Sequence, residues 1–407
     1  MSDRRIKVLV LCSHPVQYAS PAFRRMAQHP RLDVLVAYCS LQGAEPGLDP
    51  EFGVEVAWDV PLLEGYRWVH VPNRSPRPGL GRFFGLINPG LWSLIRTGDF
   101  DAVMVYTGYM YFSFWLATLA AKSKGVALLF GVDTTTLRSR DKKWWKARVK
   151  PLLLRWVFRC ADVLMAGSSA SAELMRSLGI SEEHIAVTSS PLDNDWWTRR
   201  AQQVDRAAVR AEWSVPAEAP VVLFCAKFQP WKRPQDVVRA FVKANIPEAY
   251  LVYAGEGPMR TALEAEVAAH GVCGRVRMLG FVNQLRMPAL FRAVDLFVLP
   301  SEYDPCPLVV CEAMLCGAPV VLSDEIRGRF DLIQPGKTGF IYPCGDVDAL
   351  ANIFREILQA QERLREMREA ARRRMETWSP GENIDSLARA IQLATRVRTT
   401  SNGAEAL

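Results

Sequence analysis

The chain has 407 residues, of which 49% are hydrophobic and 23% charged, and its formal net charge is +7. A chain of this length is longer than one that usually folds around a single hydrophobic core, so we expect two domains. The positive charge favours anionic ligands or an anionic membrane surface, without deciding between them. No motif supports nucleic-acid binding.

Two apolar segments bear on export and membrane insertion. The first ends at His14 and Pro15 after a short run, so it predicts a strand and not a signal peptide. The second, Tyr109 to Ala121, is shorter than the roughly 20 residues that a spanning helix needs. We therefore expect no transmembrane helix and a cytoplasmic location, with peripheral attachment to the inner face of the membrane left open.

The first half of the chain alternates short aliphatic runs with longer helical patterns. Such alternation is typical of βαβ units and a parallel sheet. The predicted strands are Ile6 to Cys12, Leu32 to Tyr38, Ala102 to Tyr106, Ala127 to Phe130, Val163 to Ala166 and Ile185 to Thr188.

A second series of strands follows the polar segment Pro191 to Trp197. Its members are Val221 to Cys225, Tyr250 to Ala254, Val276 to Leu279, Leu296 to Leu299 and Val320 to Leu322. A charged helical stretch is predicted over Ala349 to Met375 and a last helix over Asn383 to Val397. The repetition predicts an α/β fold of two Rossmann-like, doubly wound domains.

These patterns predict the following domain boundaries. The N-terminal domain covers 1–190, a linker 191–219, the C-terminal domain 220–378, a terminal helix 379–398 and a disordered tail 399–407.

The nine cysteines form no Cys-x-x-Cys pair. Cys306, Cys311 and Cys316 follow one another at regular intervals that do not suit a tetrahedral zinc site. Buried, reduced thiols in a cytosolic protein are the interpretation that this pattern favours.

The most informative stretch runs from Ser301 to Asp324 and places Asp304 and Glu312 on either side of a predicted helix start. Pro307 suits the beginning of that helix, because its missing N–H costs little there. The unpaired N–H groups of a helix start favour an anion, so Pro307, Leu308 and Val309 are candidate phosphate-binding positions. A buried helix with a capping Asp and an unrelated Glu is the alternative.

This stretch resembles the Glu-x7-Glu signature of the family 4 retaining glycosyltransferases, through Asp-Pro-Cys-Pro-Leu-Val-Val-Cys-Glu-Ala-Met-Leu-Cys-Gly-Ala-Pro-Val-Val. The resemblance implies the GT-B architecture, in which two Rossmann-like domains face each other across a cleft and the terminal helix returns to the first domain. It also implies that Asp304, in place of the first Glu, approaches the transferred sugar, and that Glu312 holds the donor ribose.

Three further segments of the second half resemble the same family. Lys227 and Lys232 stand at the positions of the Arg and Lys that grip the donor diphosphate. Their charge would stabilise the departing diphosphate, although two surface lysines beside a turn are the alternative. The donor side is completed by the Gly-rich turn with Gly255 and Gly257 and by the nucleobase loop with Phe281 and Val282. Backbone contacts to the base leave the nucleotide undetermined.

The first half departs from the usual Gly-rich turn and carries His14-Pro-Val-Gln17-Tyr instead. This pattern looks like a branch of family 4 proteins that is often found among polysaccharide assembly enzymes. His14 and Gln17 are candidates for binding donor or acceptor hydroxyls, with a structural role as the alternative. Asp133, after a strand, is the candidate acceptor-side carboxylate, and an N-cap is its alternative.

Two other features of the sequence are a pair of Asp-x-Asp strings and a basic segment that contains Trp. The Asp-x-Asp strings that begin at Asp193 and Asp346 are assigned to a linker and a helix cap, so we expect no metal and no cofactor. The segment Arg138 to Arg159 mixes basic residues with Trp and Leu. It predicts either an interfacial helix on anionic lipid or a helix with one buried face and a solvated basic one.

The predicted activity is retaining transfer of a sugar from a nucleotide-sugar donor to a hydroxyl acceptor, which could be lipid-linked, in polysaccharide or glycolipid synthesis. The alternatives are a GT-B epimerase or hydrolase of the sugar nucleotide, and an inactive sugar-nucleotide-binding partner of a polysaccharide assembly complex. The resemblance leaves the donor sugar, the acceptor and the linkage open.

Overall fold

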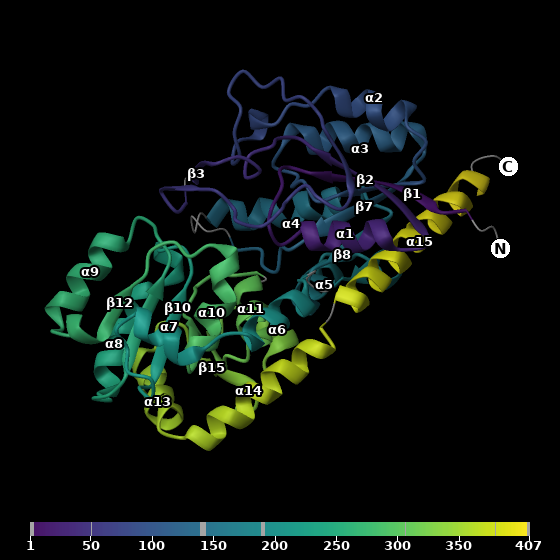
Figure 1. Cartoon of the computed structure of the whole chain (residues 1–407). Coiled ribbons are helices and arrows are strands. Elements are labelled where there is room, and N and C mark those ends of the chain that lie inside the picture. The colour runs from purple at the N-terminus through teal and green to yellow at the C-terminus, as the bar shows by residue number, and fades with distance from the viewer. Residues whose placement is uncertain are drawn as a thin grey trace. The chain divides into compact units, whose positions relative to one another are not determined.

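The computed structural model describes residues 4–49, 51–138, 144–188, 192–305, 307–378 and 380–404. The chain forms two compact units (Figure 1). Unit 1 comprises residues 1–45, 61–191 and 379–407, and unit 2 comprises residues 46–60 and 192–378.

Unit 1 is built on a parallel sheet of seven strands in the order β5-β2-β1-β6-β7-β8-β9. The strands are β1 (Ile6–Cys12), β2 (Leu32–Tyr38), β5 (Arg67–His70), β6 (Ala102–Val105), β7 (Ala127–Val132), β8 (Val163–Ala166) and β9 (Ile185–Val187). The helices are α1 (Ser20–Gln28), α2 (Gly90–Thr97), α3 (Phe112–Lys124), α4 (Trp144–Phe158), α5 (Ser169–Ser177) and α15 (Pro380–Ala404).

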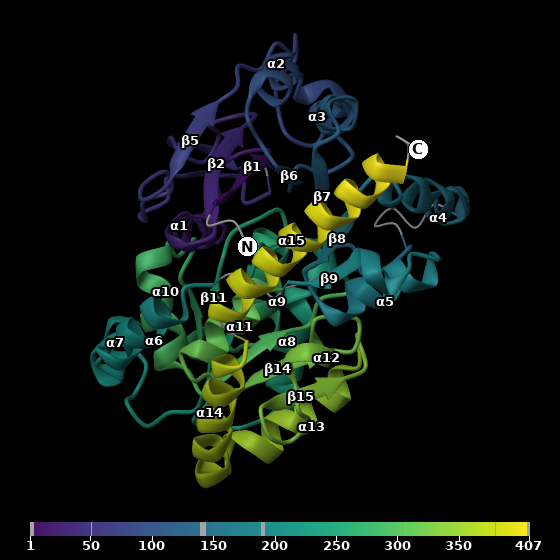
Figure 2. The ribbon, with the colours of Figure 1, turned by 90° about the vertical axis from the view of Figure 1, so that its right-hand side faces the viewer.

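Both faces of the first sheet are buried, as continuous aliphatic strands require. Leu9 and Leu11 of β1 face a core that includes side chains of α2, α3, α4 and α5. Val8 and Val10 face the opposite side, where α1 and α15 pack. Figure 2 shows α15 running along this sheet.

Unit 2 contains a parallel sheet of six strands in the order β12-β11-β10-β13-β14-β15. The strands are β10 (Val221–Cys225), β11 (Tyr250–Ala254), β12 (Val276–Met278), β13 (Leu296–Leu299), β14 (Val320–Ser323) and β15 (Gly339–Tyr342). The helices are α6 (Asn194–Gln202), α7 (Arg206–Glu212), α8 (Pro234–Ala244), α9 (Arg260–Ala269), α10 (Met287–Ala293), α11 (Leu308–Leu315), α12 (Arg329–Leu332), α13 (Val347–Leu358) and α14 (Gln361–Glu376).

The second sheet is also covered on both faces. Leu223 of β10 packs in a core with side chains of α6, α10 and α11. Phe224, the next residue, packs in a core with α8, α9 and α13. The two units are thus separate doubly wound α/β folds, which confirms the predicted fold class.

The structure corrects the predicted linker and two boundaries. Residues 192–219 form α6 and α7 of unit 2, because Trp197 and Val209 are buried in that unit. Residues 46–60 also belong to unit 2, where β3 (Gly47–Asp49) pairs with β4 (Val54–Val56) as an antiparallel hairpin. At the C-terminus, α15 continues to Ala404, beyond the predicted start of a disordered tail.

A buried ion cluster ties α7 and α14 to the sheet of unit 2. Asp295, which is 4% exposed, pairs with Arg206, Arg210 and Arg368. Its Oδ2 also accepts a hydrogen bond of 2.8 Å from the backbone N–H of Val221. The three guanidinium groups lower the pKa of Asp295 against the effect of burial, which alone would raise it.

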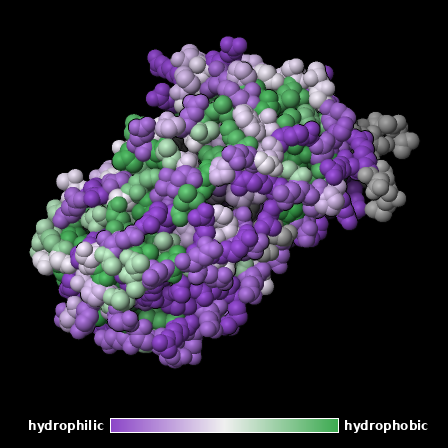
Figure 3. Space-filling model, viewed as in Figure 1, coloured by the Kyte–Doolittle hydropathy of each residue, from purple (hydrophilic) through white to green (hydrophobic). Residues whose placement is uncertain are grey.

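The surface seen in Figure 3 mixes hydrophobic and hydrophilic residues. Among the described residues, no helix combines the length and apolar character that crossing a membrane would demand. Of the described cysteines, Cys12, Cys39, Cys225, Cys311 and Cys316 are buried free thiols.

Candidate functional site

The strand order of unit 2 reverses direction between β10 and β13. Successive strands run outward from β10 through β11 to β12 on one side, and from β13 through β14 to β15 on the other. The loops after the carboxyl ends of β10 and β13 therefore diverge. Doubly wound sheets bind ligands at such a switch point. Lys227 and Lys232 follow β10, and Asp304 follows β13, so all three lie in loops at the switch point.

Lys232 and Asp304 form an ion pair, with side chains 18% and 11% exposed. Lys232 lies in a short 3-10 turn, Pro230–Lys232, before α8. The next residue, Arg233, adopts a left-handed φ of 50° and pairs with Asp236 and Glu302. These contacts hold the lysine loop against the loop that carries Asp304.

Lys227 is paired with two carboxylates, whereas the family resemblance implies that it grips the donor diphosphate. Its Nζ lies 3.2 Å from Asp49 and 2.9 Å from Glu51, both from the segment 46–60. It also lies 4.5 Å from the centre of the Phe52 ring. These partners are not apparent from the sequence, because nothing in the chain order indicates that residues 46–60 join unit 2.

Glu312 lies in α11 and is 6% exposed. Burial raises its pKa to about 7, and a hydrogen bond with the side chain of Gln284 acts in the opposite direction. Gln284, itself 8% exposed, follows the predicted nucleobase loop and was also missed by sequence analysis. Its place close behind Phe281 and Val282, separated from them by Asn283, was the available signal.

The start of α11 is placed as predicted in sequence, with Pro307 as the residue before Leu308. Pro307 is buried, and Leu308 and Val309 are partly exposed. The first backbone N–H groups of a helix have no acceptor within it, so they are suited to an anion.

Gly255 and Gly257 have a packing role in this structure. A side chain at Gly255, where φ is +142°, would collide with the carbonyl oxygen of Ala226. One at Gly257 would approach backbone atoms of Phe228 at 2.8–3.0 Å. The backbone N–H of Phe228 donates to Glu256 at 2.8 Å, so this turn supports the segment that carries Lys227.

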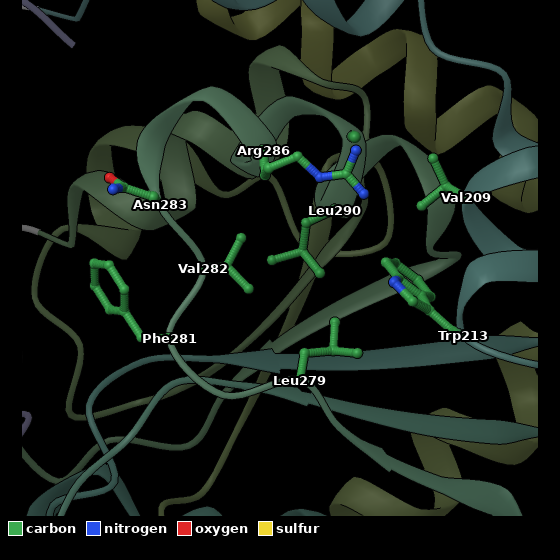
Figure 4. Close-up of a pocket in the computed structure, with 9 residues that line it drawn as sticks. Val209, Trp213, Leu279, Phe281, Val282, Asn283, Arg286 and Leu290 are labelled. Carbon is green, nitrogen blue, oxygen red and sulfur yellow. The ribbon is translucent and has the colours of Figure 1, made fainter. Parts of the chain in front are cut away.

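Phe281 and Val282 line a cavity of about 270 Å³ on unit 2 (Figure 4). Leu279, Val282 and Leu290 lie together between Phe281 and Trp213 in this view. The full lining is Val209, Trp213, Leu279, Phe281, Val282, Asn283, Arg286, Ala289 and Leu290. The ring of Phe281 also contacts the rings of Phe52 and Trp58, with centroids 5.0 Å and 5.9 Å away.

In unit 1, the order of strands reverses between β1 and β6. His14 and Gln17 follow β1, and Asp133 follows β7, so they lie in loops at the same edge of the sheet, with β6 between their strands. The Nδ1 of His14 lies 2.9 Å from Ser13 Oγ. Asp133 is exposed, and the N-cap alternative is wrong because residues 134–138 are not helical.

The two Asp-x-Asp strings serve helix starts. The side chain of Asp193 accepts a hydrogen bond from the backbone of Trp196 in α6, and Asp346 accepts one from Ala349 in α13. Within the described part of the chain, no group of three or more His, Cys, Asp or Glu residues could hold a metal ion.

Family models match both units of the chain. The model for glycosyl transferases group 1 covers residues 205–374, and the model for the glycosyl transferase 4-like domain covers residues 42–191. The chain belongs to the group 1, family 4 glycosyltransferases. Lys227, Lys232, Asp304 and Glu312 all lie within the first match.

Curated relatives of this glycosyltransferase match over part of their length. It is 26% identical to the alpha-D-kanosaminyltransferase of Streptomyces kanamyceticus, over 62% of this chain and 67% of the relative. It is 32% identical to the lipopolysaccharide core biosynthesis glycosyltransferase LpsE of Rhizobium meliloti, over 49% and 55%. For the N-acetyl-alpha-D-glucosaminyl L-malate synthase of Bacillus anthracis, the identity is 28%, over 62% and 63%. The matches thus span about half to two thirds of these relatives.

Solved structures match the glycosyltransferase over nearly all of its length. Anabaena Alr3699/HepE in complex with UDP and glucose has a TM-score of 0.72 and 20% identity, over 95% of this chain and 100% of that one. The sucrose-phosphate synthase of Thermosynechococcus elongatus has a TM-score of 0.71 and 18% identity, over 98% and 100%. These likenesses establish the GT-B fold.

Proposed function

We propose that this chain transfers a sugar from a nucleotide-sugar donor to a hydroxyl acceptor with retention of the anomeric configuration. The observation that carries the proposal is the placement of Lys227, Lys232, Asp304 and the start of α11 in loops at the switch point of unit 2. Similarity to a kanosaminyltransferase, to a lipopolysaccharide core biosynthesis glycosyltransferase and to a protein solved in complex with UDP and glucose supports it. The same similarities also favour a role in the synthesis of a cell-surface polysaccharide or glycolipid.

The proposed donor site uses positive charge without a metal ion. When the sugar leaves, negative charge grows on the oxygen of the nucleoside diphosphate. Lys232, Lys227 and the N–H groups at the start of α11 would stabilise that charge, which is the effect that a fixed electrostatic site exerts on a transition state. Glu312 would hold the donor ribose, and Phe281 and Val282 would hold the base.

In the proposed reaction, the acceptor attacks the same face of the sugar from which the diphosphate departs. The anomeric configuration is therefore retained. The acceptor oxygen bonds to the anomeric carbon as the bond to the diphosphate breaks, and a leaving phosphate oxygen takes the hydroxyl proton. Asp304, which is ion-paired with Lys232, would orient the transferred sugar. Unit 1 would bind the acceptor through His14, Gln17 and Asp133.

We also propose that unit 1 contacts anionic lipid through α4. This helix buries Leu154, Val157 and Phe158, and it also exposes apolar side chains on its outer side. Leu152 is 72% exposed and Trp156 is 58% exposed. The ring of Trp156 stacks on Trp115 of α3, with centroids 5.1 Å apart.

An exposed apolar surface next to basic residues is typical of interfacial helices. Arg155 and Arg159 are exposed in and directly after α4. Sedimentation with anionic and neutral vesicles tests the contact. The contact is supported if the wild type binds anionic vesicles and the substitutions Leu152→Ser and Trp156→Ser abolish that binding. Equal sedimentation of wild type and variants would refute it.

Donor consumption tests the activity itself. The protein is incubated with UDP-, GDP- and ADP-sugars, with and without a membrane extract, and released nucleoside diphosphate is measured. Release from one donor only with extract supports transfer to a membrane-linked acceptor. Release without extract would indicate hydrolysis or a soluble route, and binding without release would indicate an inactive partner.

A further inference from the structure

The segment 46–60 lies between β2 and β5 of unit 1 in the sequence but folds with unit 2. Its hairpin strands, β3 and β4, pair with each other and with no main sheet. What attaches the segment to unit 2 is therefore a set of contacts to loops, and these loops are the ones assigned above to the donor.

One set of contacts joins the end of the segment to the loop after β12. Asn283 Nδ2 donates to the carbonyl oxygen of Ala57 at 2.6 Å. The backbone N–H of Leu285 donates to Asp59 Oδ1 at 3.0 Å. Together with the packing of Phe52 and Trp58 on Phe281, these bonds anchor the segment beside the proposed nucleobase loop.

A second set of contacts joins the turn of the hairpin to the loop after β10. The carboxylates of Asp49 and Glu51 flank the ammonium of Lys227 at 3.2 Å and 2.9 Å. Gln229 Nε2 donates to the carbonyl oxygen of Glu51 at 2.7 Å. The turn itself fixes Asp49, because Asp49 Oδ1 accepts from the backbone N–H groups of Glu51 and Phe52 at 2.8 Å and 3.0 Å.

The charges in this arrangement oppose the binding of a phosphate at Lys227. The ammonium and its two carboxylate partners carry a net negative charge, and a diphosphate that approached would be repelled by Asp49 and Glu51. Burial alone would raise the pKa of Asp49, but its backbone hydrogen bonds and Lys227 lower it. The carboxylate therefore stays ionised near neutral pH.

We propose that Asp49 and Glu51 belong to the donor site and set its affinity by competing with the donor diphosphate for Lys227. This inference rests on the proposed function. In the donor-free protein the carboxylates hold the lysine, and on binding the phosphate oxygens take their place. The anchor at Ala57 and Asp59 keeps the hairpin attached while the acids at its turn exchange, so the segment acts as an internal competitor.

The pairing suits such an exchange. The side chains of Lys227, Asp49 and Glu51 are 28%, 27% and 51% exposed, so water reaches all three. Ion pairs with this exposure are weak, and phosphate oxygens can accept the same charge-assisted hydrogen bonds from the ammonium as the carboxylates that they replace. Removing the acids should therefore tighten diphosphate binding, whereas a purely structural hairpin would lose affinity when its contacts are removed.

Calorimetric titration of the full-length protein tests the competition. UDP, GDP and ADP are the probes, and the nucleoside of whichever diphosphate binds measures the contribution of the base and ribose without the phosphates. We expect Asp49→Asn combined with Glu51→Gln to lower the Kd of the diphosphate about two- to fivefold and to leave that of the nucleoside unchanged. Glu51→Gln alone, which alters the more exposed acid, should give a smaller change in the same direction.

Two controls define the mechanism. Glu55→Gln removes an exposed carboxylate from β4 of the same hairpin and should leave both Kd values unchanged. In a Lys227→Met background, the double substitution should no longer tighten the diphosphate. The inference is overturned if the double variant binds the diphosphate no more tightly than wild type, or if it binds the nucleoside more tightly to the same extent. Either result leaves the proposed function standing. If wild type binds none of the three diphosphates, the proposed function falls together with the inference.

Discussion

The ammonium of Lys232 is hydrogen-bonded to the carboxylate of Asp304, which lies 72 positions further along the chain. The pair joins the loop after β10 to the loop after β13, the two strands that flank the switch point of unit 2. The proposed function gives Lys232 the leaving diphosphate to stabilise, and the ion pair holds Asp304 beside it.

Lys232→Ala should lower kcat/KM for sugar transfer by about 10²–10³-fold, because it removes fixed charge from the leaving group. The check is steady-state release of nucleoside diphosphate with the donor that the protein accepts. Lys243→Ala, which removes an exposed lysine of α8 paired with Asp348, is the matched control. A Lys232 variant with a rate close to that of the control would remove the lysine from the mechanism.

Gly255→Ala should reduce both stability and donor affinity. The added methyl group meets the carbonyl oxygen of Ala226, and the φ of +142° is one that Ala rarely adopts, so the segment with Lys227 must shift. Thermal unfolding and diphosphate titration measure the two effects. Gly274→Ala, where a side chain would meet nothing within 4 Å, should change neither. Equal behaviour of the two variants would refute the packing argument.

Glu312 predicts a pH dependence of stability. Its folded pKa is about 7, against an ordinary value of 4.5, so the native state binds the proton more tightly than the unfolded chain. The stability from this group is complete below pH 4.5 and is lost as pH rises toward 7. The loss is about 3 kcal/mol at most.

The glutamine of Glu312→Gln cannot ionise. The stability of this variant relative to wild type should therefore be greater at pH 8 than at pH 5. Denaturant unfolding of both proteins at the two pH values measures this difference. Glu264→Gln, an exposed residue of α9, serves as the control. A difference between Glu312→Gln and wild type that is the same at both pH values would show that Glu312 is not a buried acid with a raised pKa.

Asp295→Ala should destabilise unit 2 by about 3–5 kcal/mol, since it leaves buried guanidinium groups without their counter-charge. Asp348→Asn, at an exposed ion pair with Lys243, should cost well under about 1 kcal/mol. Urea unfolding measures both. Similar small losses would mean that the arginines find other partners or water when Asp295 is absent.

The sequence was sufficient to predict the two sheets where strands are continuously apolar. Ile6–Cys12 and Val221–Cys225 occupy the predicted residues because both faces of each strand are buried. Arg67–His70 escaped prediction because it is an exposed edge strand with polar residues. Gly339–Tyr342 is short and begins with a glycine, so it lacked an aliphatic run.

The candidate site was predictable where its residues follow such strands. Lys232 and Asp304 lie in the segments that follow β10 and β13, and the topology of parallel strands places both loops at one edge. Asp49 and Glu51 could not be found in this way. They lie in a short hairpin whose membership in unit 2 depends on contacts of Phe52 and Asp59 with a loop more than 200 residues away.

The proposed function requires the lysine-bearing edge of unit 2 to activate a nucleotide-sugar donor. The most direct measurement is nucleoside diphosphate release from the UDP-, GDP- and ADP-sugar panel with membrane extract, by wild type, Lys232→Ala and Lys243→Ala. We expect release from one donor by wild type and Lys243→Ala, and almost none by Lys232→Ala. Equal release by all three proteins, or no release from any donor by wild type, would contradict the proposed function.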